Sequence, residues 1–313
     1  MLFAGVVAVF RKNFVLIQER YMQISLSCYN VKKECTKRER VKMKKMQPGV
    51  TGFIPWGGDY FPVLERYAKM GYKAFEGGGL MFRGDPVENT KRMHDMGLQL
   101  MALSTSVQGD AQPDVKDLVE KARIIGAPWI MIYHSGATSW RFADREFLPD
   151  YDESMREIEK MNTLANQLHA EGLQLAFHNH DQELLTHYNG VPLLWLMAAN
   201  CEHLKFEIDL GWAHYADVDP VKLIHRLGDR IVSLHVKDYL PGDNFERKPL
   251  RTVRVPRYCA PGAGVLDLYH IFEAACEEGI EWAIIEQDMQ HHLTTEESVQ
   301  AAYYNMKETG FIA

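Results

Sequence analysis

From Gly49 to the C-terminus, short apolar runs alternate with longer amphipathic runs. The apolar runs lack strict alternation of polar and apolar residues, which is typical of parallel strands buried on both faces. Eight such runs predict strands at Val50–Pro55, Tyr72–Glu76, Leu98–Ser104, Trp129–His134, Leu173–His178, Leu204–Asp209, Ile231–His235 and Trp282–Glu286.

The segments between these strands have helical spacing. One apolar set follows i, i+3, i+4, i+7 and i+8, which is typical of a helix with one buried face: Leu268, Ile271, Phe272, Ala275 and Cys276. Another helix is predicted to begin at Asp219-Pro220, because Asp caps helices and Pro suits their first turn. Glycines before four of the strands fit the position just after a helix: Gly71, Gly97, Gly172 and Gly279.

Eight strands, each followed by a helix, predict the α/β class and a single-domain (β/α)8 TIM barrel. A length of 313 residues fits one such barrel. An open doubly wound sheet is the alternative. That fold usually carries G-x-G-x-x-G after its first strand, and this motif is missing. Gly77-Gly78-Gly79 follows the second predicted strand without that pattern.

Residues 1–46 stand apart from this pattern. They carry 11 Lys/Arg against 3 Asp/Glu, including the basic run VKKECTKRERVKMKKM. We expect an atypical basic N-terminal extension at 1–46 and the barrel at 47–313. The extension is interpreted as an appended or mis-assigned start, with the initiator at Met43 or Met46. A membrane-surface or nucleic-acid arm and an ordinary N-terminal helix are the alternatives.

Charge and cysteine content narrow the function classes. The net charge is −7, and residues 47–313 alone carry −15, which argues against a general nucleic-acid partner. No apolar run approaches the roughly 18 residues that span a bilayer, so no membrane partner is expected. The five cysteines are widely spaced without a CxxC pair, which argues against a zinc ribbon and predicts a reducing, cytoplasmic location.

Ionisable residues cluster where the predicted strands end. The carboxyl ends of barrel strands meet at one mouth, which carries the active site in this fold. We therefore expect these residues to converge: Glu76, His134, His178, His180, Asp209, His235, Lys237 and Glu286. Imidazoles and carboxylates together predict a divalent cation such as Mn, Co, Zn or Fe, whereas carboxylates alone would favour Mg.

Four segments carry a family resemblance: LQLAFHNHDQEL (173–184), FEIDLGWAHYADVDPVKLIHRLGDRIVSLHVKDY (206–239), PGAGVLDL (261–268) and WAIIEQD (282–288). From about Gly49 onward the chain resembles the xylose isomerase-like barrel superfamily. That superfamily includes sugar isomerases and epimerases, inosose dehydratases, dehydroshikimate dehydratases and endonuclease IV. The motifs identify the superfamily and its barrel well, and the substrate poorly.

The resemblance implies a metal held by Glu, Asp, His and Glu from four successive strands. Asp209, His235 and Glu286 match the last three positions, and His178 stands where the first Glu is usual. A histidine there leaves the site one negative charge poorer, so we expect Mn, Co or Zn ahead of Mg, with Mn first. Glu183 is the alternative fourth ligand.

The resemblance also implies that a C–H next to a carbonyl is deprotonated, giving an enediolate. Such a step needs a base near the carbon and positive charge near the oxygen. The candidate bases are His180, Glu76 and Glu286, and related dehydratases favour His180. Lys237 is predicted to stabilise the enolate or hold a substrate oxygen, or else to pair with Asp238 or Glu207.

The expected pocket lining comes from four residues: His134, Trp212, Lys237 and Arg251. Trp212 would offer an apolar face to a sugar ring. Arg251 lies in the long segment 239–263 with three other arginines, which suggests capture of an anionic group or a contact with another subunit. Glu207 shares the face of Asp209 and is expected to support the ligands.

These observations predict a metal-dependent isomerase or epimerase acting on a carbohydrate or polyol. A dehydratase or lyase acting on a keto-sugar or inosose-like substrate is the alternative with the same site. The charge of −15 on residues 47–313 argues against an endonuclease IV-like nuclease. A non-enzymatic barrel that lost its ligand Glu is the remaining possibility. By analogy alone, such barrels often form homo-oligomers.

Overall fold

The computed structural model describes residues 43–54, 58–107, 112–137, 149–242, 245–247, 254–289 and 291–313. Its main sheet contains nine parallel strands in the order β3-β2-β1-β15-β10-β9-β6-β5-β4. The strands are β1 (Gln47–Thr51), β2 (Ala74–Glu76), β3 (Gln99–Leu100), β4 (Ala102–Val107), β5 (Trp129–Ser135), β6 (Gln174–His178), β9 (Leu204–Asp209), β10 (Ile231–Val236) and β15 (Trp282–Ile285). A strand lies at each of the eight predicted places, although β1 begins three residues and ends four residues before the predicted Val50–Pro55, and the third strand is divided in two.

The divided third strand closes the barrel. β3 pairs in parallel with β2, and β4 pairs in parallel with β5. Only Met101 separates β3 from β4, and its amide donates to the carbonyl of Phe75 at 3.1 Å. The two ends of the strand order are therefore consecutive in the chain, which confirms the predicted TIM barrel.

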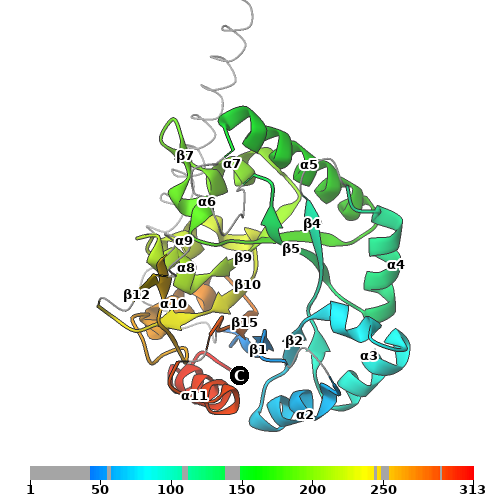
Figure 1. Ribbon diagram of the computed structural model, residues 1–313, viewed down its shortest axis with the longest axis vertical. Helices are drawn as coiled ribbons and strands as arrows, with labels where there is room; N and C mark the ends of the chain where they lie inside the picture. Colours follow the sequence, from blue (N-terminus) through cyan, green and yellow to red (C-terminus); the bar gives the residue numbers. More distant parts are fainter. Residues whose placement is uncertain are drawn as a thin grey trace, which may run out of the picture.

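Helices surround the strands (Figure 1). They are α2 (Phe61–Met70), α3 (Pro86–Asp95), α4 (Val115–Ile125), α5 (Tyr151–Ala170), α6 (Gln182–Leu185), α7 (Leu193–Asn200), α8 (Leu210–Tyr215), α9 (Pro220–Leu227), α10 (Leu268–Glu277) and α11 (Thr295–Glu308). The predicted start of α9 is confirmed, because the Asp219 carboxylate accepts from the amides of Val221 and Lys222. Gly71 ends α2 at a φ of 115°, a conformation that favours glycine.

Short turns and strand pairs lie at the ends of the barrel. The described residues include two 3₁₀ turns, η2 (Gly78–Phe82) and η3 (Gly228–Arg230). Three antiparallel pairs are β7 (His187–Tyr188) with β8 (Val191–Pro192), β11 (Asp238–Tyr239) with β14 (Tyr258–Cys259), and β12 (Phe245–Arg247) with β13 (Arg254–Pro256). The second pair joins the end of β10 to the segment before α10.

The strands bury both faces, as their sequences predicted. One buried cluster gathers residues from alternate positions of the barrel strands, among them Ala74, Ala176 and Ile284. A larger cluster, with Phe75, Phe177 and Ile285, packs the opposite faces of the same strands with the helices. Because side chains alternate along a strand, the next residues in register with the first cluster lie at the strand ends. Those residues are Glu76, His178 and Glu286.

Asp238 fastens the loop at 262–266 to the end of β10. Its Oδ2 accepts from the amides of Gly262 and Gly264, both at 3.0 Å. Its Oδ1 accepts from the amides of Tyr239, Val265 and Leu266. A Cβ at Gly264 would lie 2.3 Å from the Tyr239 carbonyl oxygen, so the close approach requires glycine. These contacts account for the PGAGVLDL motif physically.

The described chain begins at Met43, and residues 1–42 of the predicted extension lie outside the described residues. Met46 is fully buried and pairs with Ile312. Its amide donates to the Phe311 carbonyl at 2.9 Å, and its carbonyl accepts from the Ala313 amide at 2.8 Å. The domain boundary at 46/47 stays a prediction. Within the described part of the chain, no helix has the length and apolar character needed to cross a membrane.

We predict that Asp238→Asn lowers the free energy of unfolding by about 3 kcal/mol, because an amide NH₂ would face amide donors that now bond to oxygen. Urea denaturation followed by circular dichroism measures this change. Glu159→Gln on the exposed surface of α5 is the matched control and should leave stability within about 0.5 kcal/mol. Equal stability of both variants would contradict the anchoring role.

Candidate functional site

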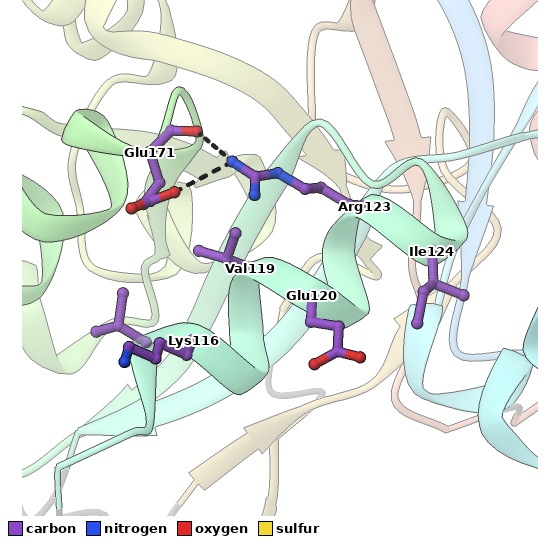
Figure 2. A pocket seen from close by; sticks show the side chains of 7 residues that line it. Lys116, Val119, Glu120, Arg123, Ile124 and Glu171 are labelled. Atoms are coloured by element: carbon purple, nitrogen blue, oxygen red, sulfur yellow. Dashed lines mark hydrogen bonds and ion pairs between the residues drawn. The ribbon is translucent and has the colours of Figure 1, made fainter.

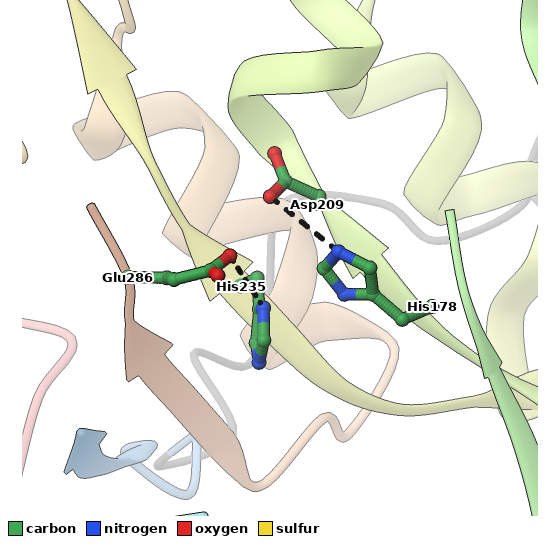
Figure 3. Close-up of side chains that lie close together, drawn as sticks. All are labelled: His178, Asp209, His235 and Glu286. Carbon is green, nitrogen blue, oxygen red and sulfur yellow. Dashed lines mark hydrogen bonds and ion pairs between the residues drawn. The ribbon is translucent and has the colours of Figure 1, made fainter. Parts of the chain in front are cut away.

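Four strand-end residues come together in the barrel mouth (Figure 3). His178 ends β6, Asp209 ends β9, His235 lies in β10 and Glu286 follows β15. Each offers one potential ligand atom, and these four atoms all lie within 4.8 Å of one another. The convergence expected from the sequence is therefore present in the fold, although their roles stay predictions.

The geometry of this cluster suits a cation. His178 Nε2 lies 3.9 Å from Asp209 Oδ2, and His235 Nδ1 lies 3.1 Å from Glu286 Oε2. His178, Asp209 and His235 are buried, whereas the Glu286 side chain is 21% exposed. Asp209 uses Oδ1 to cap α8 through the Trp212 amide, and its buried Oδ2 lacks a well-oriented hydrogen bond. Two imidazoles and two carboxylates are a donor set typical of zinc and related transition metals.

Glu207 orients both imidazoles. Its Oε1 lies 3.2 Å from His178 Nδ1 and 2.8 Å from His235 Nε2. Ser233 donates to its Oε2 at 2.6 Å. Each histidine therefore has one ring nitrogen bonded to Glu207 and the other turned toward Asp209 or Glu286. Metal-binding histidines are commonly held in this way by a carboxylate, so the residues present fit a bound cation.

Glu76 extends this network toward β2. Its Oε1 lies 3.1 Å from His235 Nε2 and accepts from the Tyr133 hydroxyl. Burial raises the pKa of Glu76, but the charge and hydrogen bond of His235 outweigh burial, so its pKa lies below its usual value. Burial and the neighbouring Glu76 charge raise the pKa of Glu207 to about 8. Tyr133, which precedes the predicted pocket residue His134, was not among the site residues predicted from the sequence.

Lys237 lies among three carboxylates. Its Nζ is 3.3 Å from Asp209 Oδ2, 2.9 Å from Glu286 Oε2 and 2.8 Å from Asp288 Oδ2. Burial raises the pKa of Asp209 to about 7 against the opposing charge of Lys237. Burial also raises the pKa of Glu286, but Lys237 and His235 together bring it well below its usual value. The prediction that Lys237 pairs with Asp238 or Glu207 was wrong. The Asp238 carboxylate accepts from the loop at 262–266, and the Glu207 carboxylate contacts the two imidazoles.

His180, His134 and Trp212 form one wall of the mouth. The ring centroids of His134 and His180 lie 5.1 Å apart in a stacked arrangement, and Trp212 lies 5.9 Å from His180. Burial and the Lys237 charge hold the pKa of His180 well below its usual value. Glu183 is buried and accepts from the His180 amide at 2.7 Å. Glu183 therefore supports the wall and is absent from the four-residue cluster.

A cavity of about 360 Å³ opens beside the cluster. Glu76, Tyr133, His235 and Glu286 line it on the cluster side. Gly52, which follows β1, Leu80 of η2 and Ser104 of β4 are among the residues that complete the lining. Its size and its polar lining suit a small hydroxylated molecule. Buried Glu76 Oε2 has no hydrogen-bond partner among the described residues, so it can accept from a ligand hydroxyl.

A larger hollow of about 520 Å³ lies on the outside of the barrel at α4 (Figure 2). Val119 and Ile124 line it with Lys116 and Glu120. Arg123 bonds there to the Glu171 carboxylate and carbonyl, both at 3.1 Å. The hollow brings together no group of imidazoles and carboxylates, so the barrel mouth is the better candidate site.

Gly211 explains the GW pair after Asp209. A Cβ there would lie 2.6 Å from the Lys237 carbonyl oxygen, so glycine lets α8 approach the end of β10. Arg251 lies outside the described residues, and so do the side chains of Arg247 and Arg254, two of the other arginines of the segment 239–263. The proposed substrate contact of Arg251 stays a prediction.

A sequence profile of the xylose isomerase-like TIM barrel matches residues 64–306, so the chain belongs to this family. It is 26% identical over 258 residues to a protein of Geobacillus kaustophilus (strain HTA426) named inosose dehydratase. That match covers 75% of this chain and 83% of the relative. Five further proteins of that name, from Lacticaseibacillus and Clostridium species, match over 48% to 58% of their own length.

Solved structures support the fold. A sugar phosphate isomerase/epimerase from Parabacteroides distasonis ATCC 8503 superposes with a TM-score of 0.65 at 18% identity, covering 86% of this chain and 100% of that one. A structure described as the IOLI protein with a binding zinc atom superposes with a TM-score of 0.62 at 15% identity. It covers 84% of this chain and 98% of that one. At these identities the likeness establishes the barrel alone.

We predict that the full chain, incubated with Mn²⁺ and freed of unbound ions, retains about one ion per chain, as a four-ligand site requires. Glu286→Ala should retain far less, because it removes one of the two carboxylate ligands. Elemental mass spectrometry measures the content. Glu120→Ala, an equivalent change on the exposed surface of α4, should behave like the unaltered protein. Equal metal content in both variants would place the ion elsewhere.

We predict that Glu207→Gln weakens divalent-cation binding about 10- to 100-fold, because an amide NH₂ replaces one of the two oxygens that accept from His178, His235 and Ser233. Calorimetric titration measures the affinity. Ser233→Ala keeps both oxygens of Glu207 and should change the affinity far less. A Glu207→Gln protein that folds normally and binds the cation with unaltered affinity would contradict the orienting role.

Proposed function

We propose that this protein is a metal-dependent enzyme that removes a proton next to a carbonyl group of a sugar or keto-polyol. The observation that carries the proposal is the cluster of His178, Asp209, His235 and Glu286, whose potential ligand atoms lie within 4.8 Å of one another beside a 360 Å³ cavity. Neither a purely structural barrel nor a non-catalytic binding module needs such a cluster beside a cavity.

The four residues of the cluster would hold the cation, with Glu207 fixing both imidazole rings. When bound, a divalent cation supplies positive charge near the carbonyl oxygen and so lowers the cost of the enediolate. The nitrogen and oxygen donors favour Mn, Co, Zn or Fe over Mg. We propose Mn first, and the zinc in the IOLI structure supports zinc as the alternative.

His180 is the proposed base. It lies on the wall of the mouth with His134 and Trp212, and its ring centroid is 4.9 Å from that of His178. Its backbone is fixed by Glu183, which keeps the imidazole in one place relative to the cluster. A proton taken from carbon by His180 leaves the electron pair on the substrate, where it forms the carbon–carbon double bond of the enediolate.

Three further residues would bind the substrate. Glu76 Oε2 can accept from a hydroxyl, and the Trp212 ring offers an apolar face to a sugar ring. Lys237 can donate to the oxygen that becomes anionic, because its ammonium already lies beside Glu286. Such a combination of acceptors, donors and one aromatic face is typical of polyol recognition and excludes a purely apolar ligand.

The sequence alone placed isomerisation or epimerisation ahead of dehydration. We now propose dehydration first, because the Geobacillus relative is named inosose dehydratase. In that outcome the β-hydroxyl leaves with a proton as water, and the electron pair of the broken C–H bond forms the new double bond. The replacement of the usual ligand Glu by His178 supports this order, since one carboxylate that could serve as a second base is missing.

We place the enzyme in a reducing, cytoplasmic compartment. Cys201, Cys259 and Cys276 are all unpaired and buried, and this supports the location expected from the cysteine pattern.

We predict that the Mn²⁺-loaded full chain exchanges the hydrogen next to the carbonyl of a keto-cyclitol for deuterium in D₂O. Proton NMR measures the loss of the C–H signal, and mass spectrometry measures loss of water from the substrate. His180→Gln should abolish exchange while retaining the bound cation, because the base is removed and the four ligands stay. Deuterium exchange together with loss of water from the substrate supports dehydration. Deuterium exchange without loss of water supports isomerisation or epimerisation.

Two results would count against this proposal. Exchange that persists undiminished in His180→Gln would exclude His180 as the base. An absence of exchange from keto-cyclitols, ketohexoses and their phosphates, with the cation bound, would exclude the enediolate step.

A further inference from the structure

The Lys237 ammonium already binds the two oxygens that a metal would need. Nζ lies 2.9 Å from Glu286 Oε2 and 3.3 Å from Asp209 Oδ2. The same Asp209 oxygen lies 3.9 Å from His178 Nε2, and the same Glu286 oxygen lies 3.1 Å from His235 Nδ1. A built-in positive charge therefore neutralises the carboxylate half of the cluster.

Lys237 has a third partner that is not part of the cluster. Asp288 Oδ2 lies 2.8 Å from Nζ, and the Asp288 side chain is 39% exposed. The faces of Trp212 and Tyr258 also lie near the ammonium, with centroids 5.2 Å and 5.7 Å from Nζ. The lysine can therefore give up Asp209 and Glu286 and still keep favourable electrostatic contacts.

The ammonium and a divalent cation oppose each other at this site. A metal bound to Glu286 Oε2 lies about 2.1 Å from that oxygen. Because Nζ lies 2.9 Å from the same oxygen, the two positive centres would be no more than about 5 Å apart. Lys237 and Asp209 are almost fully buried, so water screens this repulsion poorly. Asp209 and Glu286 supply two negative charges against three positive ones, so the ammonium then depends on Asp288 for its counter-charge.

We propose that Lys237 is an internal competitor for the metal. The inference rests on the proposed function, because it takes the four strand-end residues to be the metal ligands. Without metal, the ammonium neutralises Asp209 and Glu286. Metal binding transfers these oxygens to the cation and leaves Lys237 with Asp288. The lysine thus lowers the metal affinity of the four ligands and becomes available to a substrate oxygen only in the loaded protein.

The first test is a calorimetric titration of the full chain with Mn²⁺ and with Zn²⁺ after removal of bound ions by chelator. Lys237→Met keeps the length of the side chain and removes its charge. We expect it to bind the cation about tenfold more tightly or better, since the competing charge is gone. Lys222→Met makes the same change in net charge on exposed α9 and should leave the affinity unaltered.

Asp288→Asn supplies a second test that does not remove the lysine. Without the Asp288 carboxylate, the Lys237 ammonium keeps only Asp209 and Glu286 of its three carboxylate partners. A cation then displaces it from these two carboxylates less easily, so cation affinity should fall. The same substitution made on top of Lys237→Met should have a much smaller effect, because no ammonium is left to commit. Equal effects of Asp288→Asn in the two backgrounds would overturn the competition, leaving only a general effect of charge.

The thermal unfolding of the metal-free proteins gives an independent readout. Lys237→Met should melt at a lower temperature than the unaltered chain, because two buried carboxylates lose their counter-charge. Added Mn²⁺ should raise its melting temperature by more than it raises that of the unaltered chain. A lower melting temperature without tighter cation binding would make Lys237 a structural ion-pair partner and overturn the proposal.

The outcomes separate this inference from the proposed function. If the unaltered chain and Lys237→Met bind the cation equally well, the competition is wrong and the metal site stands. If neither binds Mn²⁺ or Zn²⁺, both the competition and the metal-dependent function fail. If only Lys237→Met binds, the competition is supported in its strongest form, and metal dependence of the unaltered chain is the part that fails.

Discussion

A network of ionisable side chains in the barrel mouth is almost entirely removed from water, and each member needs a partner to stay there. Its members include Glu76, His178, Glu207, Asp209, His235 and Lys237, each at most 2% exposed. An isolated buried charge costs several kcal/mol, so such groups persist only when paired and hydrogen-bonded. The pairing runs without a break from Tyr133 through Glu76, Glu207 and the two imidazoles to Asp209 and Lys237. A change at one member of this network therefore alters the pairing of its neighbours.

The barrel and the site were predictable from the sequence for different reasons. Strand positions follow from short apolar runs, because most side chains of a strand that is buried on both faces must be apolar. The convergence of His178, Asp209, His235 and Glu286 follows from barrel topology, since all parallel strands end at one mouth. Both inferences use rules that hold for any sequence with this pattern.

The partners of each charged group could not be predicted in the same way. Lys237 was expected to pair with Asp238 or Glu207, and it pairs with Asp209, Glu286 and Asp288. Alternation along the strand turns Asp238 away from Lys237 and toward the loop at 262–266, where it accepts from four amides. Tyr133 was missed for a similar reason. Its hydroxyl donates to Glu76, which lies 57 residues away in the sequence, and this contact depends on how β2 and β5 are placed in the barrel. Such contacts depend on three-dimensional distances that periodicity does not encode.

The Asp238 clamp has a mechanical consequence for the mouth. Asp238 directly follows Lys237, lies three residues from His235, and holds the loop at 262–266 through four amide contacts. A displacement of that loop is therefore transmitted to β10 and to the two cationic groups it carries. On the cavity side, Glu76 of β2 also reaches β10, where its Oε1 lies 3.1 Å from His235 Nε2. The end of β10 is thus held from two sides, so a ligand that enters the mouth meets charged groups whose positions are already set by the protein.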